Sequence, residues 1–516
     1  MSKGKIVFLL YQKDFSENGQ DRYFIFDDGK FSEVDSAYVV SIDCFLVTHD
    51  FWLISNSLYK NNQILPSKVI DVVLLAKIVA GSKSVDSDVQ SWDISKTIKP
   101  LFTDPEDFNS YMDIYYRRKD FDYDLYMLFS HKLADYFERV SKKAFEVGEI
   151  DRFYELELPL YNILTLAACK GIRVDNSIIR KHKENLQLDF YRELKFFSEK
   201  HNVLYELPDE GSIREKLSDL GYNVQDYTLD FLIDFLPSKG GYTDDLRNLQ
   251  KTNKSYRVYN SISSSSNRLN PIVEPYWTST SRIYHKSPSI QNISKKYRDI
   301  FIPDDGKNLC YVDYDQFEVG VMAHVSADPK MKEIYQNSDA YEDLAINVFE
   351  DKDMRKKTKI MFLSYTYGMS IENILSSVKE MGGNENKARE YFSEFTVFES
   401  WKSSIWEEFI KNGRIGTISG NYLNRVIDGN LTEKEKRTSV NHIIQGTATY
   451  VFKCALLELS KVEGLDILIP MHDAVLIQHI DKVKPEEAKK IFERVMTRLL
   501  PSVLGKASLE EFYALE

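Results

Sequence analysis

The sequence predicts an α+β protein made of several subdomains. The chain has 516 residues, which is more than a single hydrophobic core usually holds, so about two to four subdomains are expected. Apolar residues recur at helical spacing through much of residues 111–262, whereas β-prone runs stand out near the N-terminus and in two later stretches, residues 309–328 and 465–480. Each of these later stretches carries an aspartate beside a strand-like run.

The composition is typical of a globular protein with a large core, because 43% of the residues are hydrophobic and 13% are aromatic. The four cysteines are scattered and form no CxxC pair, so we expect neither a disulfide framework nor a zinc site, and a reducing compartment fits. No run is long enough for a signal peptide core or a membrane span. We therefore expect a cytoplasmic protein, or one in the host cytoplasm if a phage encodes it, with no membrane partner.

Residues 1–150 are predicted to form a separate α/β domain. Strand-like runs lie at residues 5–10, 23–26 and 38–42, and a longer apolar segment follows at 69–80. A helix is expected from Tyr111 to about Val147.

The next part of the chain, residues 150–262, is predicted to be helical. Four apolar residues recur at intervals of four, namely Leu156, Leu160, Leu164 and Ala168. Gly171 is expected to end this helix, and Gly221 and the Gly240–Gly241 pair to separate later ones. Residues 261–266 are a serine-rich loop.

The two aspartate-bearing stretches are the strongest functional signal. Asp313 follows the buried-strand pattern of residues 309–312, and a helix is expected after Gln316. Residues 467–469 and 475–477 predict a hairpin with His472 and Asp473 at its tip. A lone aspartate at a strand end is usually a turn former or a helix cap. Two strand-borne carboxylates can share a pair of Mg²⁺ ions that clamp a phosphoryl transfer.

Charge is distributed unevenly. The net charge of −12 argues weakly against a nucleic-acid partner. Residues 282–298, however, hold five basic residues and no acid, and residues 355–359 form a second basic block. A single block is most simply a solvated helix face, but basic surface confined to a cleft can hold a phosphate backbone while the outer surface stays acidic.

The second basic block opens a predicted helix. Arg355, Lys359 and Leu363 share one face of it, and Tyr367 lies one turn further on. Two cations and a tyrosine suit a triphosphate at one end and a base or sugar at the other. Gly368 can end the helix or let another part of the backbone approach closely.

Several short segments together resemble a known family. Residues 313–318 (DYDQFE), the spacing Arg355-(x)3-Lys359-(x)7-Tyr367-Gly368, and His472-Asp473 resemble motifs A, B and C of the family A DNA polymerases, the bacterial DNA polymerase I type. Further similar segments are residues 157–160 with 171–175, residues 281–282 with 289–293, and Arg437, Asn441 and residues 445–448. Chance is a poor explanation for six such blocks in the right order over roughly residues 155–516.

The resemblance implies a right-hand polymerase fold preceded by an α/β RNase H-like domain of the 3′–5′ exonuclease type. The expected parts are residues 1–150 (degenerate exonuclease-like domain), 151–268 (mostly thumb), 269–338 (palm with motif A), 339–430 (fingers) and 431–516 (palm with motif C). The resemblance further implies that the protein is a template-directed DNA polymerase that adds dNTPs to a primer 3′ end in replication or repair. The implied partners are primer–template DNA and dNTPs; we expect a monomer, and no accessory protein can be named.

The resemblance also assigns roles to residues. Asp313, Asp473 and the Tyr314 backbone would bind two Mg²⁺ ions, which Mn²⁺ can replace, and Lys359 would protonate the departing pyrophosphate. The residues implied to contact the incoming nucleotide are Arg355, Lys359, Gln316, Glu318 (a steric gate against a 2′-hydroxyl), Leu363 and Tyr367. Those implied to contact DNA are Arg282, Gln291, Asn292, Arg437, Asn441, Gln445 and His472.

Four positions depart from the family pattern: Gly320 replaces an arginine, Leu363 an aromatic residue, Ala474 a glutamate and Tyr341 a histidine. We expect the chemistry to survive, with altered sugar discrimination, fidelity or speed; neutral drift explains the changes equally well. Two alternatives follow. One is a polymerase specialised for lesion bypass, reverse transcription or unprimed synthesis, and the other is a non-catalytic nucleic-acid-binding scaffold.

The N-terminal domain is expected to lack proofreading. Residues 116–120 resemble the Y-x-x-x-D motif of these exonucleases, and Asp50 could be their middle acid. The first strand, residues 7–12, offers none of the carboxylates that such a nuclease needs to bind two metals. We therefore prefer to interpret Asp50 and Asp120 as surface acids of a structural domain.

Overall fold

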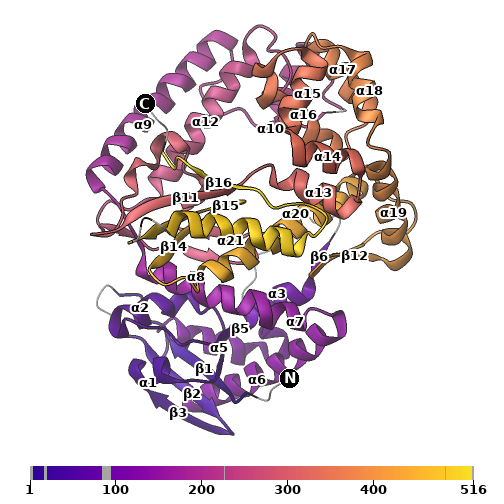
Figure 1. Ribbon diagram of the computed structural model, residues 1–516. Helices are drawn as coiled ribbons and strands as arrows, with labels where there is room; N and C mark the ends of the chain where they lie inside the picture. Colours follow the sequence, from indigo (N-terminus) through magenta and orange to yellow (C-terminus); the bar gives the residue numbers. More distant parts are fainter. Residues whose placement is uncertain are drawn as a thin grey trace.

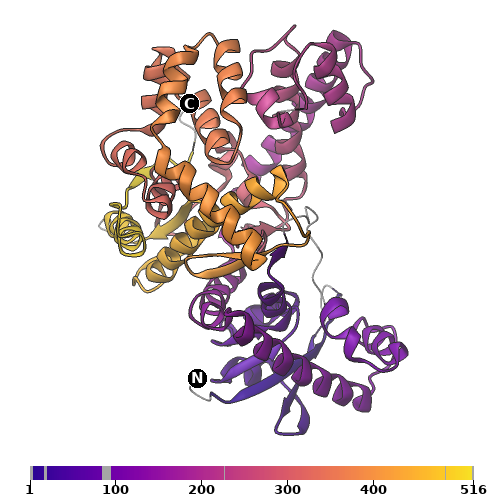
Figure 2. The same cartoon turned by 90° about the vertical axis from the view of Figure 1, so that its right-hand side faces the viewer.

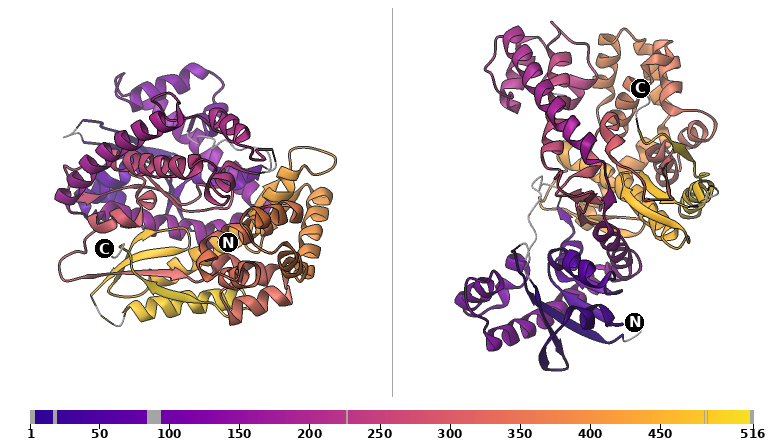
Figure 3. Two further views of the ribbon diagram at one scale, coloured as in Figure 1. Left: turned by 90° about the horizontal axis from the view of Figure 1, so that it is seen from above. Right: turned by 90° about the vertical axis from the view of Figure 1, so that its left-hand side faces the viewer.

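The computed structural model describes residues 4–16, 20–83, 94–225, 227–480, 482 and 484–513. Figure 1 shows the N-terminal sheet at the bottom of the molecule and a second sheet, crossed by helix α21, in the middle. Two groups of helices rise above this second sheet, α9 and α12 on one side and α15 to α18 on the other. Figure 2 and the right-hand view of Figure 3 show the same separation from two sides.

The N-terminal domain is built on a five-stranded sheet with the order β3-β2-β1-β4-β5. Its strands are β1 (Ile6–Gln12), β2 (Arg22–Asp27), β3 (Lys30–Val34), β4 (Phe45–Thr48) and β5 (Val69–Asp71). Its main helices are α1 (Ser36–Ser41), α2 (Trp52–Asn62), α3 (Val72–Ala80), α5 (Pro105–Tyr115) and α6 (Tyr123–Val147). Because β1 pairs antiparallel with β2 and parallel with β4, the sheet is mixed.

Two local predictions in this domain are wrong. Residues 38–41 are helical rather than extended, because the Asp35 side chain accepts a hydrogen bond from the Tyr38 amide and caps α1. The helix predicted over residues 111–147 is interrupted. Helix α5 ends at Tyr115, and α6 begins only after Asp122, whose side chain accepts from the Leu125 amide.

The predicted thumb is helical, as expected. Its elements are α7 (Ile150–Arg152), the π-helical turn η2 (Phe153–Glu157), α8 (Leu158–Lys170), α9 (Asn176–His201), α10 (Glu210–Asp219), α11 (Leu229–Asp234) and α12 (Tyr242–Asn260). Gly171 ends α8 with a positive φ of 72°, as the sequence predicts. Helices α9 and α12 pack along each other, and Phe190 stacks on Tyr256 between them.

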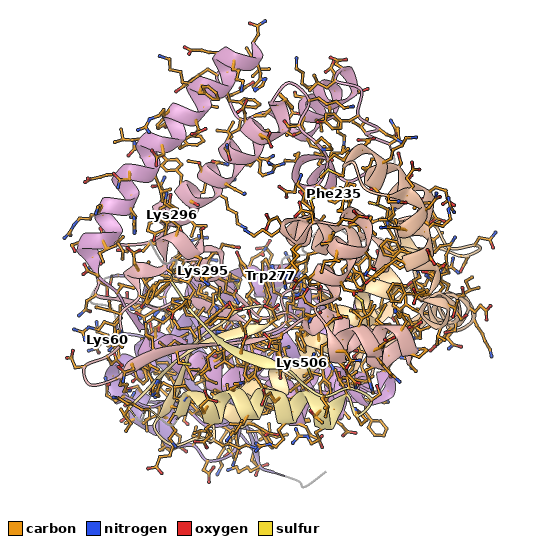
Figure 4. All side chains as sticks on the ribbon, turned by 45° about the horizontal axis from the view of Figure 1, so that its top comes forward. Lys60, Phe235, Trp277, Lys295, Lys296 and Lys506 are labelled. Carbon is orange, nitrogen blue, oxygen red and sulfur yellow. The ribbon has the colours of Figure 1, made fainter. Side chains whose placement is uncertain are left out.

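Short elements connect the thumb to the second sheet. They are β7 (Ile172–Arg173), β8 (Arg268–Leu269), β9 (Ile272–Glu274), β10 (Tyr284–Lys286), η3 (Ile290–Asn292) and η4 (Lys295–Ile300). The loop between β9 and β10 contains Trp277 and Arg282, and Trp277 is labelled near the centre of Figure 4.

The second sheet has the strand order β14-β15-β11-β16. Its strands are β11 (Asn308–Tyr314), β14 (Leu465–Pro470), β15 (Ala474–His479) and β16 (Ala507–Glu510), and the helices packed around it are α13 (Phe317–Ser326), α20 (Glu433–Leu459) and α21 (Lys484–Leu499). Every residue of β15 is buried, which explains the continuous apolar run of residues 474–477. Helix α20 begins with a capping box between Thr432 and Glu435.

The predicted fingers pack above one end of this sheet. Their elements are α14 (Pro329–Asn337), α15 (Ala340–Phe349), η5 (Lys352–Met354), α16 (Arg355–Thr366), α17 (Ile371–Glu380), α18 (Glu385–Ser393), α19 (Thr396–Asn412), β12 (Arg414–Thr417) and β13 (Gly420–Asn424). The thumb touches them, since the Tyr227 hydroxyl donates to the Asn373 carbonyl at 3.0 Å. Within the described residues, no helix combines the length and the apolar character that a membrane span requires.

Candidate active site

Two strands of the second sheet bring Asp313 and Asp473 together. Strand β11 pairs antiparallel with β15 so that Asp313 lies opposite Ala474, the neighbour of Asp473. The Tyr314 amide donates to the Asp473 carbonyl at 3.3 Å. The hairpin of β14 and β15 forms as predicted, with His472 and Asp473 in its turn. Two residues separated by 160 positions of sequence are thus neighbours at one end of the two central strands of the sheet.

The electrostatic environment of the two aspartates favours a divalent cation. One carboxylate oxygen of Asp313, Oδ1, is buried and has no hydrogen-bond partner. Burial, followed by the nearby charges of Asp473 and Glu510, raises the pKa of Asp313 to about 8. An unpartnered buried oxygen beside like charges is the environment that a bound cation relieves.

These two carboxylates do not make a complete ligand set by themselves. Among the residues that the structure describes, no group of three or more histidine, cysteine, aspartate or glutamate side chains converges as a metal site. Mg²⁺ commonly binds through only one or two carboxylates, with waters and substrate phosphates as its other ligands. The donor set therefore fits Mg²⁺ held together with a nucleotide.

Asp313→Asn is expected to stabilise the metal-free protein at pH 8. Because the folded pKa of Asp313 lies above its ordinary value of 3.8, the folded state binds more protons than the unfolded state between these two values, and stability falls as the pH rises through this window. The substitution removes this loss, so we expect its apparent Tm to exceed that of the wild type by about 2–4 °C at pH 8.

At pH 4 the difference between Asp313→Asn and the wild type should be small. Mg²⁺ should raise the Tm of the wild type at pH 8 more than that of the variant. A calorimetric scan with and without Mg²⁺ checks both points, and an equal response of the two proteins to Mg²⁺ would contradict the metal role of Asp313.

A cavity of about 470 Å³ opens beside the two aspartates. Its lining residues are Asp313, Tyr314, Asp315, Gln316, Phe317, Glu318, Asp339, Tyr341, Arg355, Lys359, Asp473, Lys506 and Glu510. The structure thus places carboxylates on the sheet side of one cavity and the cations of α16 on another side. This is the arrangement that the sequence predicts for a triphosphate between metal ions and basic side chains.

Arg355 and Lys359 share one face of α16, as predicted, and both lie over the ring of Tyr341. The Arg355 guanidinium is 5.7 Å and the Lys359 ammonium 5.5 Å from the ring centroid. Tyr341, which stands where the family pattern has a histidine, is buried, and the face of its ring attracts both cations. Arg355 also forms an ion pair with Asp339 at 2.5 Å.

Gln316 connects the second sheet to the fingers. Its backbone is in the left-handed region, with φ 48°. Its side-chain oxygen accepts from the Ala340 amide at 2.8 Å, and its nitrogen donates to the Ser338 carbonyl at 3.1 Å. The amide group therefore holds the start of α15, and a direct contact between Gln316 and a triphosphate remains a prediction.

Glu318 lies between the fingers helix and the loop of Arg282. The Arg282 guanidinium is 3.6 Å from the Glu318 carboxylate. Burial raises the pKa of Glu318. The Tyr367 hydroxyl is buried close to Glu318 and Gln445 but makes no well-formed hydrogen bond to either. Leu363 packs one turn before Tyr367 and is partly buried, so the residues predicted to contact a base and a sugar follow each other at the end of α16.

The other predicted DNA-binding residues lie on α20 and in the turn between β14 and β15. Arg437 is exposed beside Gly368. Asn441 follows it by one turn of α20, and its buried side-chain oxygen has no partner. His472 is accessible to solvent in the hairpin turn, and the partial desolvation of its ring, followed by the charge of Arg282, lowers its pKa. Contact of these residues with DNA stays a prediction.

Gln291 and Asn292 differ in how free their side chains are. The Gln291 amide is buried; it accepts from the His285 amide and donates to the carbonyls of Ile283 and Pro470. Asn292 donates to the hydroxyls of Tyr284 and Ser289. The structure thus gives Gln291 an internal role in this conformation, which a sequence pattern cannot reveal.

The presence of glycine at position 320, where the family pattern has arginine, is explained by packing. A Cβ atom at Gly320 would lie 2.5 Å from the Met496 side chain and 2.8 Å from the Tyr335 ring. These two side chains fill the space that an arginine would need. Ala474, in place of the usual glutamate, is fully buried opposite Asp313.

The sequence prediction missed three residues of the cavity wall. Glu510 reaches it because β16 pairs with β11, Tyr311 being opposite Glu510. Lys506, labelled in Figure 4, donates to the carbonyls of Tyr335 and Gln336. Asp339 carries its carboxylate there from the cap of α15. The short strand that brings Glu510 has no distinctive pattern, so only its pairing reveals it.

Comparisons with known proteins agree with this geometry. The model of the family described as DNA polymerase family A matches residues 201–508. DNA polymerase I of Bacillus caldotenax is 26% identical over 408 residues, which are 70% of this chain and 44% of that protein. The thermostable DNA polymerase I of Thermus filiformis is 27% identical over 250 residues, 43% of this chain and 29% of that protein. The chain spans less than half the length of these relatives.

A solved structure gives the same answer for the fold. It is the POL domain of Pol1 from M. smegmatis in complex with DNA primer-template and dNTP, with a TM-score of 0.73, 17% identity, and coverage of 98% of this chain and 94% of that chain. The fold is therefore the right-hand fold of polymerases, and the fold prediction is confirmed. Since the family model covers more than half of the residues, the chain belongs to DNA polymerase family A.

Proposed function

We propose that this protein is a template-directed DNA polymerase that adds dNTPs to a primer 3′ end in replication or repair. The observation that carries the proposal is the single cavity that Asp313 and Asp473 share with Arg355 and Lys359. A related chain of similar fold is titled as a complex with primer-template and dNTP, which supports the same ligands here. The chain would act as a monomer in the cytoplasm.

Each wall of the cavity would have its own task. Asp313, Asp473 and the Tyr314 carbonyl would hold two Mg²⁺ ions, and family A DNA polymerases generally use divalent metal ions. When bound, such ions supply charge neutralisation at the phosphate and a lower pKa at the primer hydroxyl. Arg355 and Lys359 would orient the triphosphate, and the Lys359 ammonium would donate a proton to the leaving pyrophosphate.

The nucleotide sugar and the duplex would lie on the side of the cavity that Glu318 lines, next to Tyr367 and Arg282. Glu318 and Leu363 would bound the sugar, and Tyr367 would lie against the templating pair. Arg282 would reach the minor groove of the duplex, where acceptor positions are shared by all correct base pairs. Such contacts check geometry without reading sequence.

Primer extension on a primed DNA template, with four dNTPs and Mg²⁺, tests the proposal. We expect extension to the template end and no extension with a chelator. Duplex binding without any incorporation would instead support the non-catalytic scaffold.

The wild-type protein is expected not to remove a mismatched primer terminus. In the N-terminal domain, the Tyr11 hydroxyl donates to the carbonyls of His49 and Asp50, and the Tyr115 hydroxyl donates to Tyr11. Aromatic side chains thus fill the end of the first strand, where a two-metal nuclease needs carboxylates. Asp120 is exposed, in agreement with a surface acid.

Gel analysis of a 5′-labelled mismatched primer with Mg²⁺ and no dNTPs measures this directly. Asp120→Ala should behave as the wild type. Metal-dependent shortening of the primer that disappears in Asp120→Ala would contradict the expectation.

A further inference from the structure

A buried ionic network lies beneath the loop that carries Arg282. Lys453 of α20 and Glu157 at the end of η2 are both fully buried, and their charges meet at 2.7 Å. Arg152 adds a second cation to Glu157, at 2.6 Å. Desolvation makes a buried ion pair a weak source of stability, so this network is better explained by what it holds in place.

What Lys453 holds is the loop between β9 and β10. A lysine ammonium has three donors. Besides Glu157, its partners are the Pro275 carbonyl at 2.8 Å and the Ser281 hydroxyl at 2.6 Å. One buried charge therefore ties both ends of the loop. Asn421 holds the middle, since its side-chain nitrogen donates to the Ser279 carbonyl at 3.2 Å.

Ser281 has a backbone conformation that side-chain-bearing residues seldom adopt. Its φ is 63°, in the left-handed region. Its hydroxyl accepts from Lys453 and donates to Glu157 at 3.0 Å. Such a conformation persists only where its surroundings fix it, and here the network supplies that restraint.

Arg282 is the next residue after this fixed turn. Its carbonyl accepts from the Trp277 amide at 3.0 Å, and its own amide donates to the Thr278 hydroxyl at 3.1 Å. Its guanidinium then points to Glu318, 3.6 Å away. The direction of a long, flexible side chain is thus set by a turn whose geometry depends on Lys453, Glu157 and Ser281.

We propose that Lys453, Glu157 and Ser281 are positioning residues that aim Arg282 at the primer–template beside the reacting end. The inference rests on the proposed function, in which Arg282 contacts the duplex. It adds that the preference for a matched primer end depends on buried groups that never touch DNA. A matched end makes the Arg282 contact and a mismatched end does not, so a misdirected Arg282 slows only the matched reaction.

Three serine variants test this. Ser281→Ala removes the hydroxyl and keeps a strained backbone, and Ser281→Gly removes the hydroxyl and frees the backbone. Ser130→Ala removes an equally buried serine hydroxyl in α6, far from the loop, and is the matched control. Extension of matched and mismatched primers is measured as kcat/KM for each.

We expect Ser281→Ala to lower the ratio of matched to mismatched extension about 10-fold, within the range that a small misplacement costs. Ser281→Gly should lower it at least as much, and Ser130→Ala should leave it unchanged. In an Arg282→Ala background, adding Ser281→Ala should change nothing further, because the serine acts through the arginine.

Several results would overturn the proposal. They are an unchanged ratio in both Ser281 variants, losses that multiply in the Ser281→Ala/Arg282→Ala double variant, or no effect of Arg282→Ala. Lys453→Met tests the other end of the network, and if it does not fold the serine variants still decide. A wild-type protein without incorporation would defeat the proposed function and this inference together, whereas normal incorporation with unchanged ratios defeats this inference alone.

Discussion

Replacing either Asp313 or Asp473 by asparagine is expected to reduce nucleotide incorporation by about 10³-fold or more, the scale on which phosphoryl transfer depends on charge-stabilising groups. Asparagine keeps the size of the side chain but removes the negative charge that attracts a divalent cation. The buried Oδ1 atom of Asp313 has no hydrogen-bond partner in the protein, so we expect its charge to serve the cation. Single-turnover primer extension measures the effect, and duplex binding, followed by fluorescence anisotropy, should stay within a few-fold of the wild type.

Asp466→Asn is the matched control for these variants. Asp466 lies on β14 at the opposite end of the same hairpin, where it pairs with Lys307 at 2.6 Å. Its loss should change stability slightly and incorporation little. Incorporation within 10-fold of the wild type in either Asp313→Asn or Asp473→Asn would remove the basis of the two-metal assignment.

The sequence could predict these aspartates because their signals are local. The apolar run before Asp313, the paired β-prone runs around Asp473 and the helical spacing after Arg355 each lie within about two turns or one strand of chain. The prediction was wrong where two local signals disagreed. Residues 38–42 have β-prone side chains, but Asp35 caps a helix there, and residues 38–41 are helical.

Tertiary pairing decided what the sequence could not. Glu510 reaches the cavity through the register of β16 on β11, and nothing in its own neighbourhood marks it. Gln291 has the residue type expected of a minor-groove contact, yet the Pro470 carbonyl, 179 positions away, fixes its amide inside the protein. The space at Gly320 likewise depends on Met496. The sequence can therefore predict which residue types form the site, but the direction in which each side chain points depends on the fold.

Removing the cation at Arg355 or Lys359 is expected to raise the KM for dNTPs by about 10–100-fold, because a hydrogen bond to a charged group contributes about 1.5–3 kcal/mol. Lys359→Ala should also lower the maximum rate, since Lys359 is the residue placed to donate a proton. Lys356→Ala is the control: Lys356 belongs to the same basic block, but it is exposed and does not line the cavity. Steady-state incorporation of a single dNTP separates KM from kcat for each variant.

Arg355 differs from Lys359 in one respect that sharpens the test. Its guanidinium neutralises Asp339, 2.5 Å away at the cavity wall. Arg355→Ala therefore leaves an unpaired carboxylate facing the triphosphate, and part of its effect should be repulsion rather than a lost contact. Asparagine at position 339 removes that charge and can still cap α15, so Arg355→Ala/Asp339→Asn should recover part of the lost affinity. If the double variant binds dNTPs no better than Arg355→Ala, or if Lys356→Ala is as damaging as either cation variant, the assignment of this face of α16 to the triphosphate is wrong.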